Sequence, residues 1–256
     1  MTGRVAGKAA LISGAATGIG QSIAMRLAAE GAAVAVADID ALRGGEVVAE
    51  IQAAGGEATF IALDVTNEDA WRGAVGAVES AFGHLDILVN NAGIAIIESV
   101  DKMSLEDWRA VMAVNIDGVF LGTKHAVPAM RRAGGGSIIN ISSILGLTGE
   151  EKLSAYSASK GAVHVFSQDL RHDLKGTGIR VTEVSPGRTA TEIFATMTDD
   201  QAAQTAMAEG FEIITAEDVA EAVVWALDQP WRGNVSLIEL TATEQIPGGV
   251  GIHPVT

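Results

Sequence analysis

Short apolar runs alternate with longer amphipathic stretches along this chain. The runs are short enough, and apolar enough throughout, to be strands buried on both faces. They predict strands at 9–12, 33–37, 58–63, 86–90, 137–141, 179–184 and 235–240. The stretches between them show helical spacing and are often followed by glycine. They predict helices at 21–30, 41–54, 68–82 and 104–132, one ending near 174, and a mostly helical excursion at 191–228 that breaks near Gly210.

This alternation indicates the fold class. Strands joined by helices of this length form right-handed βαβ units and an open parallel sheet. No linker rich in Pro or Ser divides the chain. Residues 1–256 are therefore predicted to form a single α/β domain, a Rossmann-like, doubly wound sheet of about seven parallel strands with helices on both faces. In such sheets ligands bind beyond the carboxyl ends of the strands.

Composition and charge exclude several function classes. The chain has no cysteine, so disulfides, thiolate nucleophiles and cysteine metal sites are excluded. The five histidines show no ligand spacing, and no metal is expected. A net charge of −15 argues against nucleic acid as a partner. With neither a signal peptide nor an apolar run long enough for a membrane helix, we expect a soluble, cytoplasmic protein without a membrane partner.

A glycine-rich turn follows the first predicted strand and precedes the first predicted helix. Glycines at 14, 18 and 20 let the backbone approach a pyrophosphate, and the helix N-terminus supplies free N–H groups. We expect Gly14, Thr17, Gly18, Ile19 and Gly20 to contact a dinucleotide.

Asp38 ends the second predicted strand, 18 residues after Gly20. A carboxylate there can accept hydrogen bonds from both ribose hydroxyls of an adenosine and repels a 2′-phosphate. Arg43 is the nearest basic candidate for such a phosphate. We therefore expect NAD rather than NADP as the cofactor. The alternative is that Asp38 is only a turn residue at a strand end.

The next two strand ends carry further candidates for cofactor binding. Asp64 and Val65 end the third predicted strand, where an adenine ring is expected, and the carboxylate could accept its amino group. Asn91, Ala92 and Gly93 follow the fourth, where an amide can brace neighbouring loops and the glycine backbone can approach the cofactor.

Tyr156 is the only tyrosine of the chain, and Lys160 follows it by four residues. Positions i and i+4 share one face of a helix. An ammonium group beside a phenol favours the ionised form, so we expect Lys160 to lower the phenol pKa. Such a phenol can exchange a proton with an alcohol or a carbonyl oxygen. The alternative is a half-buried core tyrosine beside a surface lysine.

In combination and order, these motifs resemble the short-chain dehydrogenase/reductase family over essentially the whole chain. The resemblance rests on the glycine-rich turn, Asp64-Val65, Asn90-Asn91-Ala92-Gly93, Asn115, Ser142-Ser143, Tyr156-Ser157-Ala158-Ser159-Lys160 and Pro186-Gly187. The chain departs from the family pattern in two places. Ser13 replaces the usual threonine, and Arg188-Thr189 follows the Pro-Gly pair where an aliphatic residue is often found two positions past the glycine.

The resemblance implies roles for four catalytic residues. Tyr156 is the general acid or base, and Ser143, which lies 13 residues before it, holds the substrate oxygen. Lys160 lowers the phenol pKa and binds the nicotinamide ribose. Asn115 kinks a long helix and holds a water in the proton path.

The resemblance also implies how the nicotinamide and the substrate are bound. Pro186, Gly187, Thr189 and Thr191 are expected to contact the nicotinamide end. A lid at about 188–214 is expected over the substrate. The substrate candidates are Ile94, Leu145, Glu150, Leu153, Arg188, Ile193 and Phe194. Arg188 could pair with an anionic substrate group, or it could form a salt bridge at the surface or at a subunit interface.

These expectations combine into one functional prediction. The chain should transfer a hydride between NAD(H) and a small polar secondary alcohol or ketone, such as a hydroxy acid or a sugar. Family members are usually dimers or tetramers, so a homodimer or homotetramer is expected. The alternatives are an NADP-linked 3-oxoacyl (carrier-protein) reductase, which Asp38 and the acidity oppose, and a non-catalytic nucleotide sensor, which the intact catalytic residues oppose.

Overall fold

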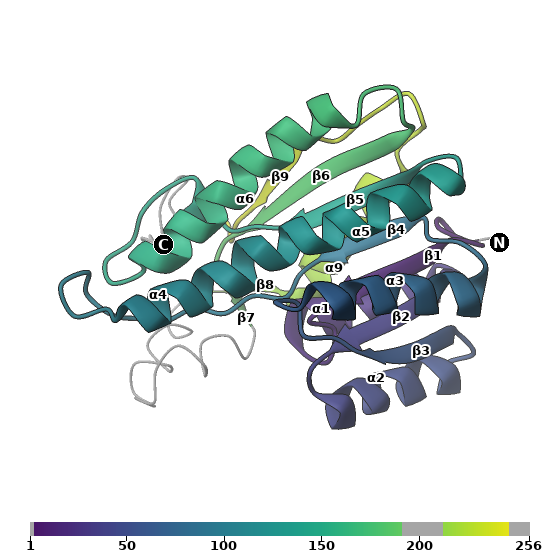
Figure 1. The fold of residues 1–256 in the computed structure, drawn as a ribbon, viewed down its shortest axis with the longest axis horizontal. Helices are drawn as coiled ribbons and strands as arrows, with labels where there is room; N and C mark the ends of the chain where they lie inside the picture. Colours follow the sequence, from purple (N-terminus) through teal and green to yellow (C-terminus); the bar gives the residue numbers. More distant parts are fainter. Residues whose placement is uncertain (1–2, 191–211, 246–256) are drawn as a thin grey trace.

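A computed structural model describes residues 3–190 and 212–245 of the chain. Its centre is a parallel sheet of seven strands in the order β3-β2-β1-β4-β5-β6-β9 (Figure 1). The strands are β1 (Ala9–Ser13), β2 (Ala33–Asp38), β3 (Glu57–Ala62), β4 (Ile87–Asn90), β5 (Gly136–Ile141), β6 (Ile179–Pro186) and β9 (Leu237–Leu240). A separate parallel pair joins β7 (Thr189–Ala190) to β8 (Ile214–Thr215). The predicted doubly wound parallel sheet is confirmed.

Helices cover both faces of the sheet (Figure 1). They are α1 (Gly18–Ala29), α2 (Ala41–Ala53), α3 (Glu68–Phe82), α4 (Leu105–Met112), α5 (Gly118–Arg132), α6 (Ser154–Asp173) and α9 (Ala216–Asp228). Local sequence sets several of their ends. Asp40 and Asn67 accept hydrogen bonds from backbone N–H groups in the first turns of α2 and α3. Gly83 ends α3 in the left-handed conformation, with φ 84°, which glycine adopts without a steric penalty.

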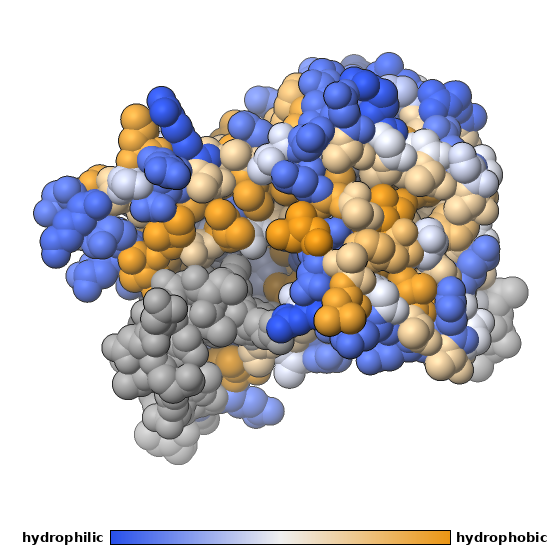
Figure 2. Space-filling model, turned by 60° about the horizontal axis from the view of Figure 1, so that its bottom comes forward, coloured by the Kyte–Doolittle hydropathy of each residue, from blue (hydrophilic) through white to orange (hydrophobic). Residues whose placement is uncertain are grey.

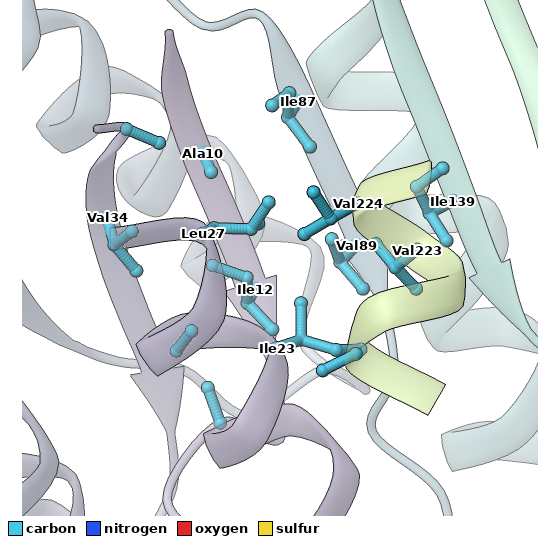
Figure 3. Close-up of a cluster of buried hydrophobic side chains, with 14 of the residues drawn as sticks. Ala10, Ile12, Ile23, Leu27, Val34, Ile87, Val89, Ile139, Val223 and Val224 are labelled. Atoms are coloured by element: carbon cyan, nitrogen blue, oxygen red, sulfur yellow. The ribbon is translucent and has the colours of Figure 1, made fainter. Parts of the chain in front are cut away.

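The apolar side chains form one core on each face of the sheet. On one face, Ile12, Ile23, Val89, Val223 and neighbouring residues pack between the sheet, α1 and α9 (Figure 3). On the other face, residues of α3, α5 and α6 pack against the same strands around the fully buried Trp71. The sheet is therefore held rigidly from both sides, and its carboxyl ends are a fixed platform for a site.

Three predicted elements differ from the observed ones. The single helix expected over 104–132 is divided by a π-helical turn, Ala113–Asp117. The first helix starts at Gly18 rather than at 21, so the last two glycines of the turn belong to its first turn. Within 191–228, the described part contains β8 and α9, whereas 191–211, and with it most of the predicted lid, lies outside the described residues.

In the described part of the chain, no helix is long and apolar enough to cross a membrane. The same residues include no group of three or more His, Cys, Asp or Glu side chains arranged to hold a metal ion.

Candidate active site

The carboxyl ends of the central strands open into a cleft of about 710 Å³. On the face shown in Figure 2, hydrophobic and hydrophilic residues border a hollow in the surface. Most of the residues predicted from the sequence line this cleft: Gly14, Thr17, Gly18, Ile19, Asp38, Asp64, Val65, Asn91, Ala92, Gly93, Ile94, Ser143, Leu145, Glu150, Leu153, Tyr156, Lys160, Pro186, Gly187, Arg188 and Thr189. Three others, Thr191, Ile193 and Phe194, lie outside the described residues.

The glycine-rich turn is packed too tightly for side chains. Gly14 has φ +64°, and a Cβ there would lie 2.8 Å from the Cα of Ala92. A Cβ on Gly20 would lie 2.1 Å from the carbonyl oxygen of Gly14 and 2.5 Å from the side-chain nitrogen of Asn91. Gly20 is buried and does not line the cleft. Gly20 therefore allows α1 to pack closely against the turn at Gly14 and against the side chain of Asn91.

Side-chain hydrogen bonds join this turn to the end of β4. The amide of Asn91 donates to the carbonyl oxygens of Ser13 (3.0 Å) and Gly14 (2.9 Å). The hydroxyl of Ser13 accepts from the backbone N–H groups of Asn91 and Ala92 at 3.1 and 3.2 Å. The predicted bracing role of the amide is thus visible in the contacts of Asn91. Ser13 stands where the family pattern usually has threonine, and its hydroxyl oxygen accepts both of these backbone hydrogen bonds.

The two predicted adenosine-side carboxylates lie at the cleft and also organise their own turns. Asp38 accepts backbone hydrogen bonds from Ala16 and Asp40, both at 3.0 Å. Asp64 accepts from the backbone N–H of Thr66 at 2.9 Å and from its hydroxyl at 2.7 Å. These bonds fix both carboxylates at the edge of the cleft, where a ligand can meet them.

Helix α6 and the end of β5 bring the catalytic candidates together. Tyr156 and Lys160 are buried on one face of α6, with the ammonium nitrogen 5.7 Å from the centre of the phenol ring. Lys160 donates to the carbonyl oxygen of Ile141 at 2.8 Å. Ser143, just beyond β5, hydrogen-bonds to the phenol. Neighbouring Ser142 instead donates to the carbonyl oxygen of Lys160 at 3.1 Å.

The predicted lowering of the phenol pKa is wrong for this structure. Burial raises the pKa of Tyr156 above its ordinary value, and the hydrogen bond with Ser143 offsets only part of that effect. Burial also lowers the pKa of Lys160 to about 8, although the charge of Glu183 acts in the opposite direction. Both groups lose solvation, which disfavours their charged forms. The i,i+4 spacing of the two residues carries no information on this desolvation, which depends on the fold around them.

Asn115 lies behind the cleft rather than in it. It sits in the π-helical turn between α4 and α5 and is fully buried. Its amide donates to the carbonyl oxygen of Ile94 at 2.9 Å and to the hydroxyl of Ser159 at 3.0 Å, and its oxygen accepts from the N–H of Ile94 at 2.9 Å. Asn115 therefore connects the helical irregularity to the loop after β4 and to α6, which carries Tyr156.

The walls near Tyr156 are mainly apolar. A small cluster of Ala95, Ile144, Leu145 and Tyr156, with Leu153 packed against it, forms one side. The exposed Glu150 and the partly exposed Arg188 also line the cleft. The backbone N–H of Arg188 donates to the side-chain oxygen of Gln245 at 3.1 Å, so the segment after β9 meets the predicted nicotinamide end.

Comparison with known proteins identifies the family. The family model described as short chain dehydrogenase matches residues 8–202. The chain belongs to this family. The cyclopentanol dehydrogenase of Comamonas sp. (strain NCIMB 9872) is 45% identical over 189 residues, which cover 74% of this chain and 76% of that protein.

Two solved structures of dehydrogenases extend the match to nearly the whole chain. The closed form of a serine dehydrogenase complexed with NADP+ superposes with a TM-score of 0.89 at 32% identity, covering 96% of this chain and 100% of that one. A 7α-hydroxysteroid dehydrogenase complexed with NADH and 7-oxo glycochenodeoxycholic acid has a TM-score of 0.86 at 29% identity, covering 98% and 96%. The chain is thus an oxidoreductase by family; one of these two neighbours is complexed with NADP+ and the other with NADH.

Sequence reasoning missed a further set of residues that line the cleft: Ala16, Ile39, Asp40, Leu63, Ile97, Val114, Ile141, Ser142, Ile144 and Glu151, with Arg43 considered only as a phosphate partner. Several stand immediately beside predicted residues, at strand ends or in the same turns. Adjacency to a motif was the only signal available for them. Val114 directly precedes Asn115 in the π-helical turn, whereas Ile97 adjoins no predicted residue and comes to the cleft through the loop after β4.

Proposed function

We propose that this short-chain dehydrogenase transfers a hydride between NAD(H) and a cyclic secondary alcohol or ketone, with Tyr156 as the general acid or base. The observation that carries the proposal is the convergence of Tyr156, Ser143 and Lys160 in the cleft that the glycine-rich turn also lines. A cofactor site and proton-transfer groups therefore share one space, as hydride transfer requires.

The residues at the cleft fit a nicotinamide dinucleotide. The turn at Gly14 leaves no room for a Cβ, and Thr17, the N-cap of α1, makes no side-chain capping hydrogen bond, so the first N–H groups of α1 can meet a pyrophosphate. The residues that would hold the nicotinamide end are Gly93, Lys160, Pro186, Gly187 and Thr189. When bound, the cofactor supplies the hydride acceptor or donor.

The protein's own groups would move the proton. Ser143 would orient the substrate oxygen beside the phenol of Tyr156. In alcohol oxidation, the phenolate removes the hydroxyl proton; in ketone reduction, the phenol returns it to the carbonyl oxygen. Because the phenol pKa is raised in the unliganded protein, a positive charge close to it is needed for oxidation at neutral pH. Lys160, whose ammonium nitrogen lies 5.7 Å from the centre of the phenol ring, would supply part of this charge, together with the positive charge of the oxidised nicotinamide when it is bound.

The apolar walls favour a cyclic carbinol over the small polar alcohol expected from the sequence. Ile144, Leu145 and Leu153 present aliphatic surface next to Tyr156, and burial of an alicyclic ring against them is favourable. The relatives named for cyclopentanol and for a 7α-hydroxysteroid support this class. Polar recognition would then be confined to the carbinol oxygen and to substituents at the cleft mouth.

A substrate and cofactor panel tests this function. Purified protein would be assayed with cyclopentanol, cyclohexanol, hydroxysteroids, hydroxy acids and sugar alcohols, each with NAD and with NADP. We expect the highest kcat/KM for cyclic alcohols with NAD. Turnover confined to sugars or hydroxy acids would contradict the substrate class, and a higher kcat/KM with NADP would contradict the cofactor.

Replacement of Asp38 should reduce the preference for NAD. The variant Asp38→Asn with Ile39→Arg keeps a hydrogen-bond acceptor at position 38, removes its charge and adds a cation at an exposed residue that lines the cleft. Because charged hydrogen bonds contribute about 1.5–3 kcal/mol, the ratio of kcat/KM for NAD to that for NADP should fall at least about tenfold. Ile39→Arg alone is the control, and an unchanged ratio in the double variant would contradict the assignment of Asp38.

Arg188 is proposed to recognise an anionic substituent on the substrate. Its guanidinium group suits bidentate pairing with a carboxylate. Arg188→Met should raise KM for ring alcohols that carry a carboxylate by about tenfold and leave KM for cyclopentanol nearly unchanged. Equal KM values in wild type and variant for every anionic substrate would remove this role. Arg72→Met, a surface replacement on α3, is the matched control.

A homodimer or homotetramer stays a prediction. The exposed apolar residues Phe120 on α5 and Val165 on α6 support it, because neighbouring long helices then offer apolar surface for a second copy. Light scattering of the purified chain would give the mass.

A further inference from the structure

A fully buried glutamate in β6 has no part in the function described above. Glu183 is 0% exposed. One carboxylate oxygen lies 2.8 Å from the Nδ1 of His164 on α6, and the other accepts from the hydroxyl of Ser185 at 2.9 Å. The second ring nitrogen of His164 lies 2.7 Å from the side-chain nitrogen of Gln168. The carboxylate is therefore held in place from two directions.

Glu183 and Lys160 lie in the same interface between α6 and the sheet. His164 follows Lys160 by one helical turn, so both point from the same face of α6. Lys160 reaches the carbonyl oxygen of Ile141 in β5, and Ile141 pairs in register with Val184, the residue after Glu183. A buried anion and a buried cation thus occupy the same interface between sheet and helix, about one turn of α6 apart.

The other charged groups around Lys160 do not take this role. The elements packed against α6 in the described part of the chain also carry Glu106, Asp107 and Arg109 on α4 and Asp117 in the π-helical turn. On α6 itself, Arg171 lies farther along and also feels the charge of Glu183. Among the described residues, Glu183 is the anion whose charge acts on Lys160 and favours its protonated form. Without it, the buried ammonium would lack an opposite charge, which is costly.

We propose that Glu183 is a positioning residue for the reaction: its carboxylate, fixed by His164 and Ser185, keeps Lys160 charged beside Tyr156. The inference rests on the proposed function, in which the ammonium group acts on the phenol. Loss of the anion should therefore reach the chemistry through Lys160, without contact between Glu183 and the substrate.

The test compares Glu183→Gln, which keeps the shape and removes the charge, with Glu183→Asp, which keeps the charge. Glu239→Gln, an exposed carboxylate on the adjacent strand β9, is the matched control. NMR of protein labelled at the lysine ε-carbon would follow the titration of Lys160 in the unliganded state, with Lys160→Met identifying the signal. The second readout is the pH profile of kcat/KM for the preferred nicotinamide cofactor, which reports the free enzyme.

We expect Lys160 to titrate near pH 8 in wild type and at least about one unit lower in Glu183→Gln, since a nearby opposite charge typically shifts a pKa by about one to three units. The alkaline limb of the kcat/KM profile should move to lower pH by the same amount. At pH values above both midpoints, kcat/KM of the variant should therefore be about tenfold lower than that of the wild type. Glu183→Asp and Glu239→Gln should stay close to wild type. If Glu183→Gln does not fold, Glu183→Ala combined with His164→Leu and Ser185→Ala removes the carboxylate together with the two side chains that hydrogen-bond to it.

The outcomes separate the two proposals. An unchanged Lys160 titration in the charge-removing variants overturns the role of Glu183, whatever the activity. A shifted titration with an unshifted kcat/KM profile also overturns it, because the charge would then not reach the reaction. A shifted titration in a protein that oxidises no alcohol overturns the proposed function while supporting the electrostatic link.

Discussion

Replacement of Tyr156 with Phe should lower kcat by about 10²- to 10⁴-fold, the usual contribution of a positioned general acid or base. The change removes one hydroxyl and keeps the ring that packs with Ile144 and Leu145. NADH binding, followed by its fluorescence, should therefore change little, and so should thermal stability. Turnover close to wild type would mean that another group moves the proton.

The same variant gives access to the phenol pKa. Because Tyr156 is the only tyrosine, tyrosinate absorbance in the wild type arises from this residue alone, and Tyr156→Phe is the blank. The unliganded protein should ionise above the ordinary value, because burial disfavours the phenolate. With phenolate as the base, alcohol oxidation should quicken as pH rises through the phenol pKa of the cofactor complex, and ketone reduction should slow. Ionisation below the ordinary value in the free protein would contradict the desolvation argument.

Replacement of Gly20 with Ala should destabilise the fold by about 2–3 kcal/mol, in the range for forcing a methyl group into a packed site. The new Cβ would lie 2.1 Å from the carbonyl oxygen of Gly14, which is backbone that cannot simply rotate away. The turn must move, so the dissociation constant of NADH should also rise by at least about tenfold. Urea unfolding and fluorescence titration measure the two effects.

Gly73→Ala provides the matched control for this prediction. Gly73 is exposed in the middle of α3, and an added Cβ there meets nothing within 4 Å. Alanine is favoured over glycine in a helix by about 1 kcal/mol, so this variant should be slightly more stable and bind NADH normally. Equal effects of the two replacements would show that the contact at Gly20 is not what matters.

Sequence alone determined the order of the elements and most of the residues that line the cleft. Buried parallel strands are continuous apolar runs, and glycine, asparagine and aspartate mark their ends, so each strand was predicted within a few residues of its observed range. The range predicted for α3 is the observed one. The spacing of Ser143, Tyr156 and Lys160 is equally local, because one helix face and one strand end suffice to bring them together.

Tertiary structure decided what depends on burial and on contacts distant in sequence. Desolvation reversed the expected shift of the Tyr156 pKa, and solvent exclusion is a property of the whole fold rather than of a pair of residues. The hydrogen bonds of Asn115 with Ile94 and Ser159, and the approach of Glu183 to α6, join residues 19 to 44 positions apart. No local sequence pattern encodes contacts between residues so far apart in the chain. They arise because the helices pack across a sheet in which strands that are adjacent in space are often not adjacent in sequence.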